Sequence, residues 1–191
     1  ANNTRGIYTL GVAVPAGVSN VMEYVTISTL GNAADFGDLS VARHNAAGLS
    51  SNTRGINGGG ATPGLSDVID YVTISTVGNA TDFGNLSVAR ASAAGANSSS
   101  NINTIDYITI ASTGNAIDFG DLTVARRGLH GSVASNTIRG TFAGGQAPAN
   151  TEVIDYVTIA STGNALDFGD LIIATNNVAA SANGHGGLTG G

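Results

Sequence analysis

The chain contains no cysteine and no tryptophan, and because all seven of its basic residues are arginines it contains no lysine either. Without cysteine there can be no disulfide, thiolate metal site or thiol nucleophile, and without lysine there is no residue for a Schiff base. Charged residues occupy only 10% of the 191 positions, against about a quarter in an average globular protein. Several classes of enzyme are therefore excluded before any motif is considered.

Basic charge and long apolar runs are also scarce. The formal net charge is −6, whereas proteins that bind nucleic acid gather Lys and Arg to neutralise phosphates. No apolar run is long enough to span a membrane, and the first residues lack the basic and apolar parts of a signal peptide. We therefore expect neither a nucleic-acid partner nor a membrane span. Because the chain starts at Ala1 rather than Met, we interpret its start as a processed terminus or the beginning of a fragment.

One sequence motif occurs four times in the chain. Each copy holds a tyrosine, a β-branched run, a Gly-Asn pair and a closing run that begins Asp-Phe-Gly. The copies recur at intervals of about 36 to 49 residues, a period typical of solenoids, propellers and repeat arrays. The repeated aromatic residues, which we expect to pack in the core, are Tyr24, Tyr71, Tyr107 and Tyr156, followed by Phe36, Phe83, Phe119 and Phe168.

Each copy is predicted to form a β-hairpin. Val, Ile, Thr, Tyr and Phe favour strands, and a Gly-Asn pair supplies the positive φ angles of a tight reversal. We therefore place the reversals at Gly31-Asn32, Gly78-Asn79, Gly114-Asn115 and Gly163-Asn164. An isolated hairpin is marginally stable in water, so the four copies must share a core.

A second, weaker repeat lies between the hairpins. It consists of a small-residue run and then an Arg-Gly segment such as "NTRGINGGG" from Asn52. A complete repeat should thus contain four strands: a small-residue strand, an Arg-Gly strand, a Tyr strand and a Phe strand. The repeats occupy residues 1–43, 44–90, 91–126 and 127–175 of one repeat domain. The third lacks the Arg-Gly segment and should have three strands, and helix should be nearly absent.

The order "R…AAG…RGINGGG…VIDYVTI…DFGNLSVAR" resembles the kelch repeat, with Phe where kelch usually has Trp. The shared phrase "IDYVTIASTGNAxDFGDLTVAR" is also similar to kelch-like structural proteins of marine bacteriophages. The resemblance implies an all-β fold, a four-bladed kelch-like β-propeller with one shortened blade. A β-solenoid-like array is the alternative fold.

The chain starts at the second strand of a repeat, and its tail, residues 176–191, resembles the missing first strand. If this tail pairs beside Gly6 to Val12, it closes the ring and removes the open edges. The same strand could instead be donated to a neighbouring molecule.

Pairs of acidic residues in the closing runs are candidate calcium ligands, since oxygen ligands suit this ion. The alternative is that these aspartates cap turns through backbone N–H groups. The candidates are Asp35 with Asp38, Asp118 with Asp121 and Asp167 with Asp170.

Opposite charges recur at two places of the repeat. We expect them to form ion pairs between repeats, with a ligand-facing ring of arginines as the alternative. Glu23 and Thr175 break the pattern in the first and last repeats. The paired positions are Arg43, Arg90 and Arg126 on one side and Asp70, Asp106 and Asp155 on the other.

Two further residue types are candidate sites. The histidines His44, His130 and His185 could bind zinc, but isolated surface histidines are the favoured interpretation. The sequons at Asn2, Asn79, Asn85 and Asn97 are candidate glycosylation sites, although such matches also arise by chance in an Asn- and Ser-rich chain.

The acidic groups repeat symmetrically, whereas a catalytic centre normally breaks repeat symmetry. We therefore expect no catalytic residue and no cofactor, and we interpret the chain as non-enzymatic. The expected role is a building block of an extracellular or virion-associated assembly, a phage fibre or surface filament, whose partner is the protein itself through strand exchange. The alternative is an adhesion module that binds a host glycan or surface protein.

Overall fold

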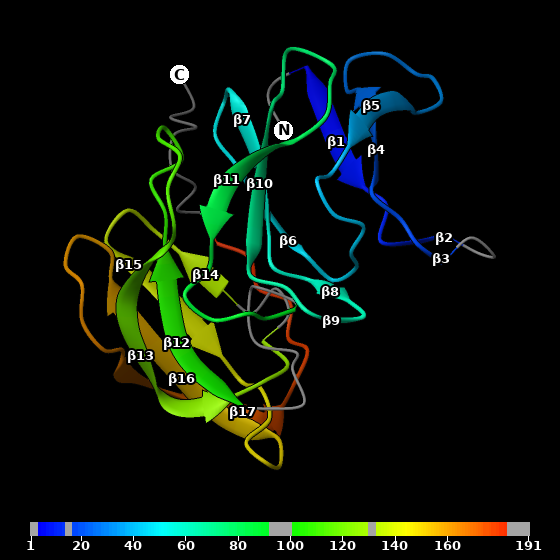
Figure 1. Ribbon diagram of the computed structural model, residues 1–191. Helices are drawn as coiled ribbons and strands as arrows, with labels where there is room; N and C mark the ends of the chain where they lie inside the picture. The colour runs from blue at the N-terminus through cyan, green and yellow to red at the C-terminus, as the bar shows by residue number, and fades with distance from the viewer. Residues whose placement is uncertain (1–3, 14–16, 92–100, 130–132, 183–191) are drawn as a thin grey trace. The chain divides into compact units, whose positions relative to one another are not determined.

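A computed structural model describes residues 4–13, 17–91, 101–129 and 133–182 (Figure 1). Every regular element among them is a β-strand and none is a helix, which confirms the all-β prediction. The strands are β1 (Arg5–Thr9), β2 (Val12–Ala13), β3 (Gly17–Val18), β4 (Val21–Thr26), β5 (Ala34–Asp38), β6 (Ala47–Ser50), β7 (Arg54–Gly58), β8 (Ala61–Thr62), β9 (Gly64–Leu65), β10 (Val68–Thr73), β11 (Thr81–Asn85), β12 (Ile102–Tyr107), β13 (Ile117–Arg126), β14 (Val133–Ser135), β15 (Arg139–Ala143), β16 (Thr151–Thr158) and β17 (Leu166–Thr175).

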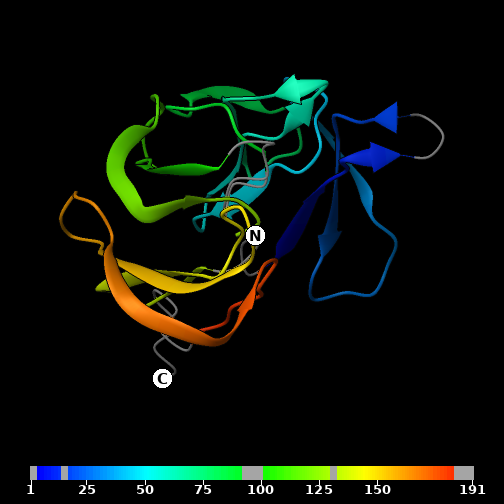
Figure 2. The same ribbon diagram turned by 90° about the horizontal axis from the view of Figure 1, so that it is seen from below.

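Each repeat forms an antiparallel sheet of its own. The second and fourth repeats have the predicted four strands in the predicted order, β6-β7-β10-β11 and β14-β15-β16-β17. Among the described residues the first repeat has three strands, β1-β4-β5, of which β1 is the Arg-Gly strand. Figure 2 shows the long strands β16 and β17 running side by side. The pairs β2-β3 and β8-β9 are short hairpins outside these sheets, and each of their strands has two residues.

The third repeat pairs only β12 with β13 among the described residues. The small-residue strand that we predicted there falls on residues 92–100, outside the described part of the chain. The predicted closing strand at 176–191 lies partly outside it as well, and its described part, residues 176–182, contains no strand. The ring closure by this tail therefore stays a prediction.

The Tyr and Phe strands form hairpins as predicted, but the Gly-Asn pairs do not make the reversal. The chain turns earlier, where the N–H of Thr29 donates to the carbonyl of Thr26 at 3.2 Å, and Thr76 to Thr73 at 3.1 Å. None of the asparagines in these pairs has a positive φ. This prediction was wrong, because the turn forms before the pair in each copy, and the last three pairs bind another repeat instead.

The described residues fall into two compact units, one within Ala1–Ala91 and Ile108–Ile117 and the other within Ser92–Tyr107 and Asp118–Gly191. Alternate strand residues point to opposite faces of a sheet, so only part of the apolar residues of a strand is buried. The first unit buries Met22, Phe36, Leu39, Val72, Ile56, Ile69 and Phe83, and the second buries Leu122, Leu129, Val157 and Ala165. None of the described residues belongs to a helix long and apolar enough to cross a membrane.

The repeated aromatic residues pack edge to face within each hairpin. The Tyr and Phe ring centroids of every repeat lie 5.9 to 6.0 Å apart at interplanar angles of 75° to 89°. This geometry adds about 1 kcal/mol to the burial of each pair. Burial differs along the chain, however, because Phe36 is 2% exposed and Phe168 is 54% exposed.

Candidate functional site

The segment Gly-Asn-Ala of each later repeat binds the Phe strand of the repeat before it. Gly78 and Ala80 donate their N–H groups to the carbonyls of Phe36 and Asp38, each at 2.8 Å. The side-chain oxygen of Asn79 accepts the N–H of Asp38 at 3.0 Å. Three hydrogen bonds thus join the Gly-Asn-Ala loop to β5, the edge strand of its sheet. We call this contact the repeat clamp.

The repeat clamp occurs three times with nearly the same geometry. In the second copy Gly114 and Ala116 donate to Phe83 and Asn85 at 2.8 Å, and Asn115 accepts from Asn85 at 3.0 Å. The third copy joins Gly163, Asn164 and Ala165 to Phe119 and Asp121 over 2.7 to 3.1 Å. The sequence repeat therefore encodes a repeated contact between neighbours as well as a repeated hairpin.

The alanine of the clamp enters the core of the preceding repeat. Ala165 is 5% exposed and packs with Leu122 and Val157, while Ala80 packs against the cluster that contains Phe36. A Phe strand is therefore covered by the following repeat. This explains why Phe36 and Phe83 are buried, at 2% and 3% exposure.

The glycine of Asp-Phe-Gly permits the close approach of the clamp. Gly37 has a φ of +134°, and a Cβ there would lie 2.5 Å from the backbone carbonyl of Gly78. A Cβ on Gly84 or Gly120 would likewise meet the backbone of the following repeat. Glycine is required at these positions by both the backbone conformation and the missing space.

A buried ion pair forms a second contact between consecutive repeats. Arg43 lies 2.9 Å from the carboxylate of Asp70 in the next repeat, and both side chains are completely buried. Ser40 donates its hydroxyl to the same carboxylate at 2.7 Å, and Arg43 also donates to the carbonyl of Asn57 at 3.2 Å. The predicted pairing of these charges between repeats is confirmed here.

The same arrangement recurs in the second compact unit. Arg126 lies 2.9 Å from Asp155, and Thr123 donates its hydroxyl to that carboxylate. Burial of the Arg126 guanidinium lowers its pKa from the ordinary arginine value, while the carboxylate of Asp155 opposes this shift. The Nε atoms of Arg43 and Arg126 are buried without a hydrogen-bond partner among the described residues. Each guanidinium thus contacts its paired carboxylate and one backbone carbonyl, that of Asn57 for Arg43 and that of Phe142 for Arg126.

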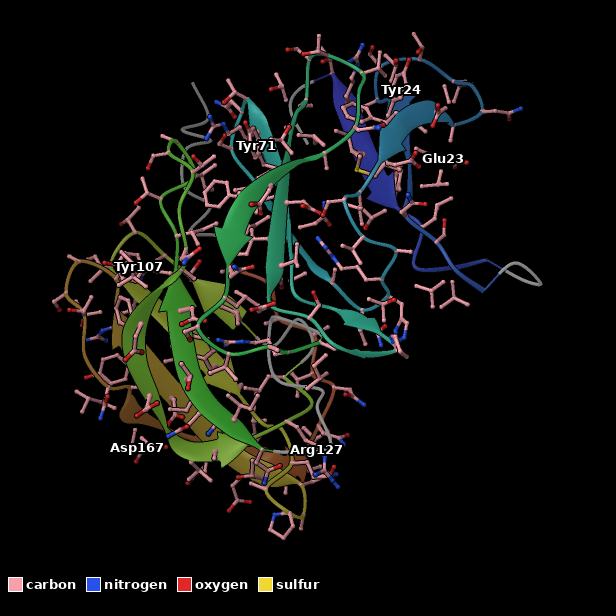
Figure 3. All side chains as sticks on the ribbon, in the orientation of Figure 1. Glu23, Tyr24, Tyr71, Tyr107, Arg127 and Asp167 are labelled. Carbon is pink, nitrogen blue, oxygen red and sulfur yellow. The ribbon has the colours of Figure 1, made fainter. Side chains whose placement is uncertain are left out.

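A third contact joins an arginine, a tyrosine and a carbonyl. Arg5 stacks on Tyr24 of its own repeat at 4.8 Å from the ring centroid and donates to the carbonyl of Ile74 in the next repeat at 3.0 Å. Arg54 stacks on Tyr71 at 4.7 Å and donates to Ile110 at 2.9 Å. The labelled tyrosines Tyr24 and Tyr71 can be followed in Figure 3.

Arg139 provides a natural comparison, because it stacks on Tyr156 at 4.8 Å but is exposed and donates to no carbonyl among the described residues. We expect Arg54→Met to lower the free energy of unfolding by about 2 kcal/mol, from one charge-assisted hydrogen bond and one cation–π contact. Arg139→Met should cost about 0.5 kcal/mol, from the exposed cation–π contact alone. Urea titrations followed by far-UV circular dichroism measure both values, and equal losses would contradict the role of the Ile110 carbonyl.

The acidic residues proposed as calcium ligands lie on the strands β5, β13 and β17. The first aspartate of each pair accepts the N–H two residues later, as Asp35 does from Gly37 at 3.2 Å and Asp118 does from Gly120 at 3.0 Å. The backbone of Asp38 and Asp121 takes part in repeat clamps. Among the described residues, no three His, Cys, Asp or Glu side chains gather as a metal site would require. Asp167 accepts from Gly169 in the same way, and Asp170 follows it on β17.

The other predicted sites are only partly described. His44 forms an isolated bridge with Ala61, whereas His130 and His185 lie outside the described residues. Of the glycosylation candidates, Asn79 uses its side-chain oxygen in a repeat clamp and Asn85 uses its backbone in another. Asn2 and Asn97 lie outside the described residues. Glycosylation stays a prediction.

One hollow of about 280 Å³ opens in the first compact unit, between β1 and the sheet of the second repeat. Its lining includes the polar side chains of Thr9, Ser50 and Asn57 and the apolar side chains of Ile7, Leu49 and Val72. The hydroxyl of Thr9 lies 3.5 Å from the side-chain oxygen of Asn57. The lining holds no ionisable side chain, so this hollow suits a neutral ligand.

Sequence reasoning missed the repeat clamp. The signal was present, since Gly-Asn-Ala recurs in all four copies, but a Gly-Asn pair is also typical of a hairpin turn. No protein-family model and no curated protein matches this chain.

Proposed function

We propose that this protein is a non-enzymatic structural repeat protein, a building block of an extracellular or virion-associated assembly such as a phage fibre or a surface filament. The proposal rests chiefly on strand β17, a ten-residue strand at the edge of its sheet. Edge strands of this length, when apolar and uncovered, favour pairing with another chain. On β17, Phe168 is 54%, Ile172 is 102% and Ile173 is 75% exposed.

The low charge of the chain adds support. Only 10% of the residues are charged, so there is little electrostatic repulsion between copies that pack against each other. The fold that we propose for the subunit is a four-bladed kelch-like β-propeller with one shortened blade, closed through a neighbouring copy rather than by its own chain. The four-stranded sheets of the second and fourth repeats support it, and a β-solenoid-like array is the alternative.

Electron micrographs of purified protein test this function. Negative-stain images and sedimentation velocity at about 1 to 100 µM should reveal filaments or oligomers whose size increases with concentration, as expected for interfaces in the micromolar range. A single monomeric species over the whole range would contradict the proposal.

An adhesion module is the second candidate, favoured by the hollow that Thr9, Ser50 and Asn57 line. Hydroxyl and amide groups beside apolar side chains suit a neutral sugar of a host glycan. Binding of a glycan by monomeric protein, abolished by Asn57→Leu, would favour this role over assembly. Unchanged binding by that variant would place the ligand elsewhere.

A further inference from the structure

The last repeat presents a complete acceptor for a repeat clamp, and the first repeat presents a complete donor. The acceptor in each internal clamp is the backbone of Phe-Gly-Asp or Phe-Gly-Asn. In the last repeat these residues are Phe168, Gly169 and Asp170 on β17. The donor segment Gly-Asn-Ala occurs in the first repeat as Gly31, Asn32 and Ala33.

Both halves are uncovered. Phe168 is 54% exposed, whereas Phe36 and Phe83 in occupied acceptors are 2% and 3% exposed and Phe119 in the third is partly buried. No described atom lies within 4 Å of a Cβ built on Gly169, although its φ of +135° equals that of the occupied Gly37 within one degree. Ala33 is exposed, whereas Ala165 in an occupied clamp is 5% exposed.

The groups of the third internal contact, an arginine stacked on tyrosine and an isoleucine carbonyl, are also present in the last and the first repeat. Arg139 stacks on Tyr156 in the position from which Arg5 and Arg54 reach the carbonyl of an isoleucine in the next repeat. The equivalent isoleucine of the first repeat is Ile27, which is 58% exposed. Two of the three internal contacts, the repeat clamp and the arginine–carbonyl contact, therefore have matching groups in the last and first repeats.

We propose that these two surfaces bind each other between molecules, so that the Gly31–Ala33 loop of a second copy clamps onto Phe168–Asp170 of the first. Gly31 and Ala33 would donate to the carbonyls of Phe168 and Asp170, and Asn32 would accept the N–H of Asp170. The side chain of Ala33 would enter the apolar site beside Phe168. Because donor and acceptor are different surfaces, the contact is heterologous and can be extended from copy to copy. This inference rests on the proposed role in assembly and names the contact that performs it.

The buried ion pair is absent from this end contact. Ile172 and Thr175 stand where Ser40 and Arg43 bind Asp70, and Glu23 stands where Asp70 would be. Figure 3 shows Glu23 next to Tyr24 on β4. Of the two charges only the arginine is lost, to Thr175, so the carboxylate of Glu23 would have no counter-charge in the end contact. The end contact should therefore be weaker than the internal interfaces.

The test is sedimentation velocity on the full chain and two matched variants. Ala33→Arg puts a charged side chain into the proposed apolar site and should weaken association at least tenfold. Leu30→Arg adds the same charge three residues away, where Leu30 is 106% exposed and the equivalent Val77 stays 54% exposed beside an occupied clamp. It should associate as the wild type does, and unchanged thermal melting would show that both variants fold.

A gain-of-function variant gives a second readout. Glu23→Asp with Ile172→Ser and Thr175→Arg restores the composition of an internal interface and should tighten association about tenfold. The cysteine-free chain allows a third readout, in which Asn32→Cys and Asp170→Cys variants are mixed with a short thiol cross-linker. A covalent heterodimer that exceeds both homodimers is expected.

The outcomes separate the two proposals. If the wild type assembles but Ala33→Arg does so equally well, the end contact is wrong while the role in assembly stands. If the wild type stays monomeric at every concentration, the role in assembly and the end contact both fail. A monomeric wild type whose melting temperature falls with Ala33→Arg would show that the two surfaces bind within one chain, and it would overturn binding between copies.

Discussion

Gly37→Ala is expected to lower the free energy of unfolding by about 4 kcal/mol, whereas Gly169→Ala should cost only about 1 to 2 kcal/mol. The two glycines share a φ of +134° and +135°, so the conformational strain of an added Cβ is the same in both. At Gly37 the new Cβ would also lie 2.5 Å from the carbonyl of Gly78. At protein concentrations at which the chain is monomeric, the difference between the variants therefore measures the repeat clamp.

Urea titration followed by far-UV circular dichroism, together with tyrosine fluorescence, measures these values. The chain has five tyrosines and no tryptophan, so the fluorescence comes from residues within the repeats. Equal losses for the two variants would show that backbone strain accounts for the whole effect and that the clamp adds no stability. The Gly37 variant should also lose amide protection at Gly78 and Ala80, whose N–H groups bind β5.

Arg43→Met should destabilise the protein by about 3 to 5 kcal/mol, because it leaves the carboxylate of Asp70 buried without its counter-charge. Both side chains of this pair are completely buried. Thr175→Met changes the equivalent position of the last repeat, where no ion pair forms, and should cost less than about 1 kcal/mol. Chemical denaturation of the two variants gives the comparison.

A double variant separates the lost pair from lost packing. Arg43→Met with Asp70→Asn removes the uncompensated charge, so it should recover at least half of the stability that Arg43→Met loses. If the double variant is no more stable than the single one, the effect of Arg43 comes from the packing of its long side chain. The pair would then be a consequence of the fold rather than a source of its stability.

The strands were predictable because their signal is local. The run Val-Ile-Asp-Tyr-Val-Thr from Val68 is rich in β-branched and aromatic residues, and it forms β10. The order of the four strands was also predictable, because strands that are consecutive within the repeat pair with each other in the second and fourth repeats. The pairing of Arg43 with Asp70 was also predictable, because opposite charges recur at fixed positions of the repeat.

The Gly-Asn-Ala segment shows where sequence reasoning failed. A Gly-Asn pair has the same residues whether it turns a hairpin or binds another repeat, since glycine suits both tight turns and close approaches of backbone. The choice depends on which partner lies opposite. That partner, Phe36 for Gly78, is more than forty residues away along the chain.

The sequence by itself determined that the protein is built of strands, that it repeats one unit four times and that arginine and aspartate recur at fixed positions of the repeat. These properties depend on residue type and on the spacing of residues along the chain, both of which can be read directly from the sequence. The tertiary structure alone decided that the Gly-Asn-Ala segments clamp consecutive repeats and that Phe168 is exposed where Phe36 is buried. The burial of a side chain depends on which residues lie next to it in space. Four nearly identical sequence motifs therefore differ in burial only once the chain has folded.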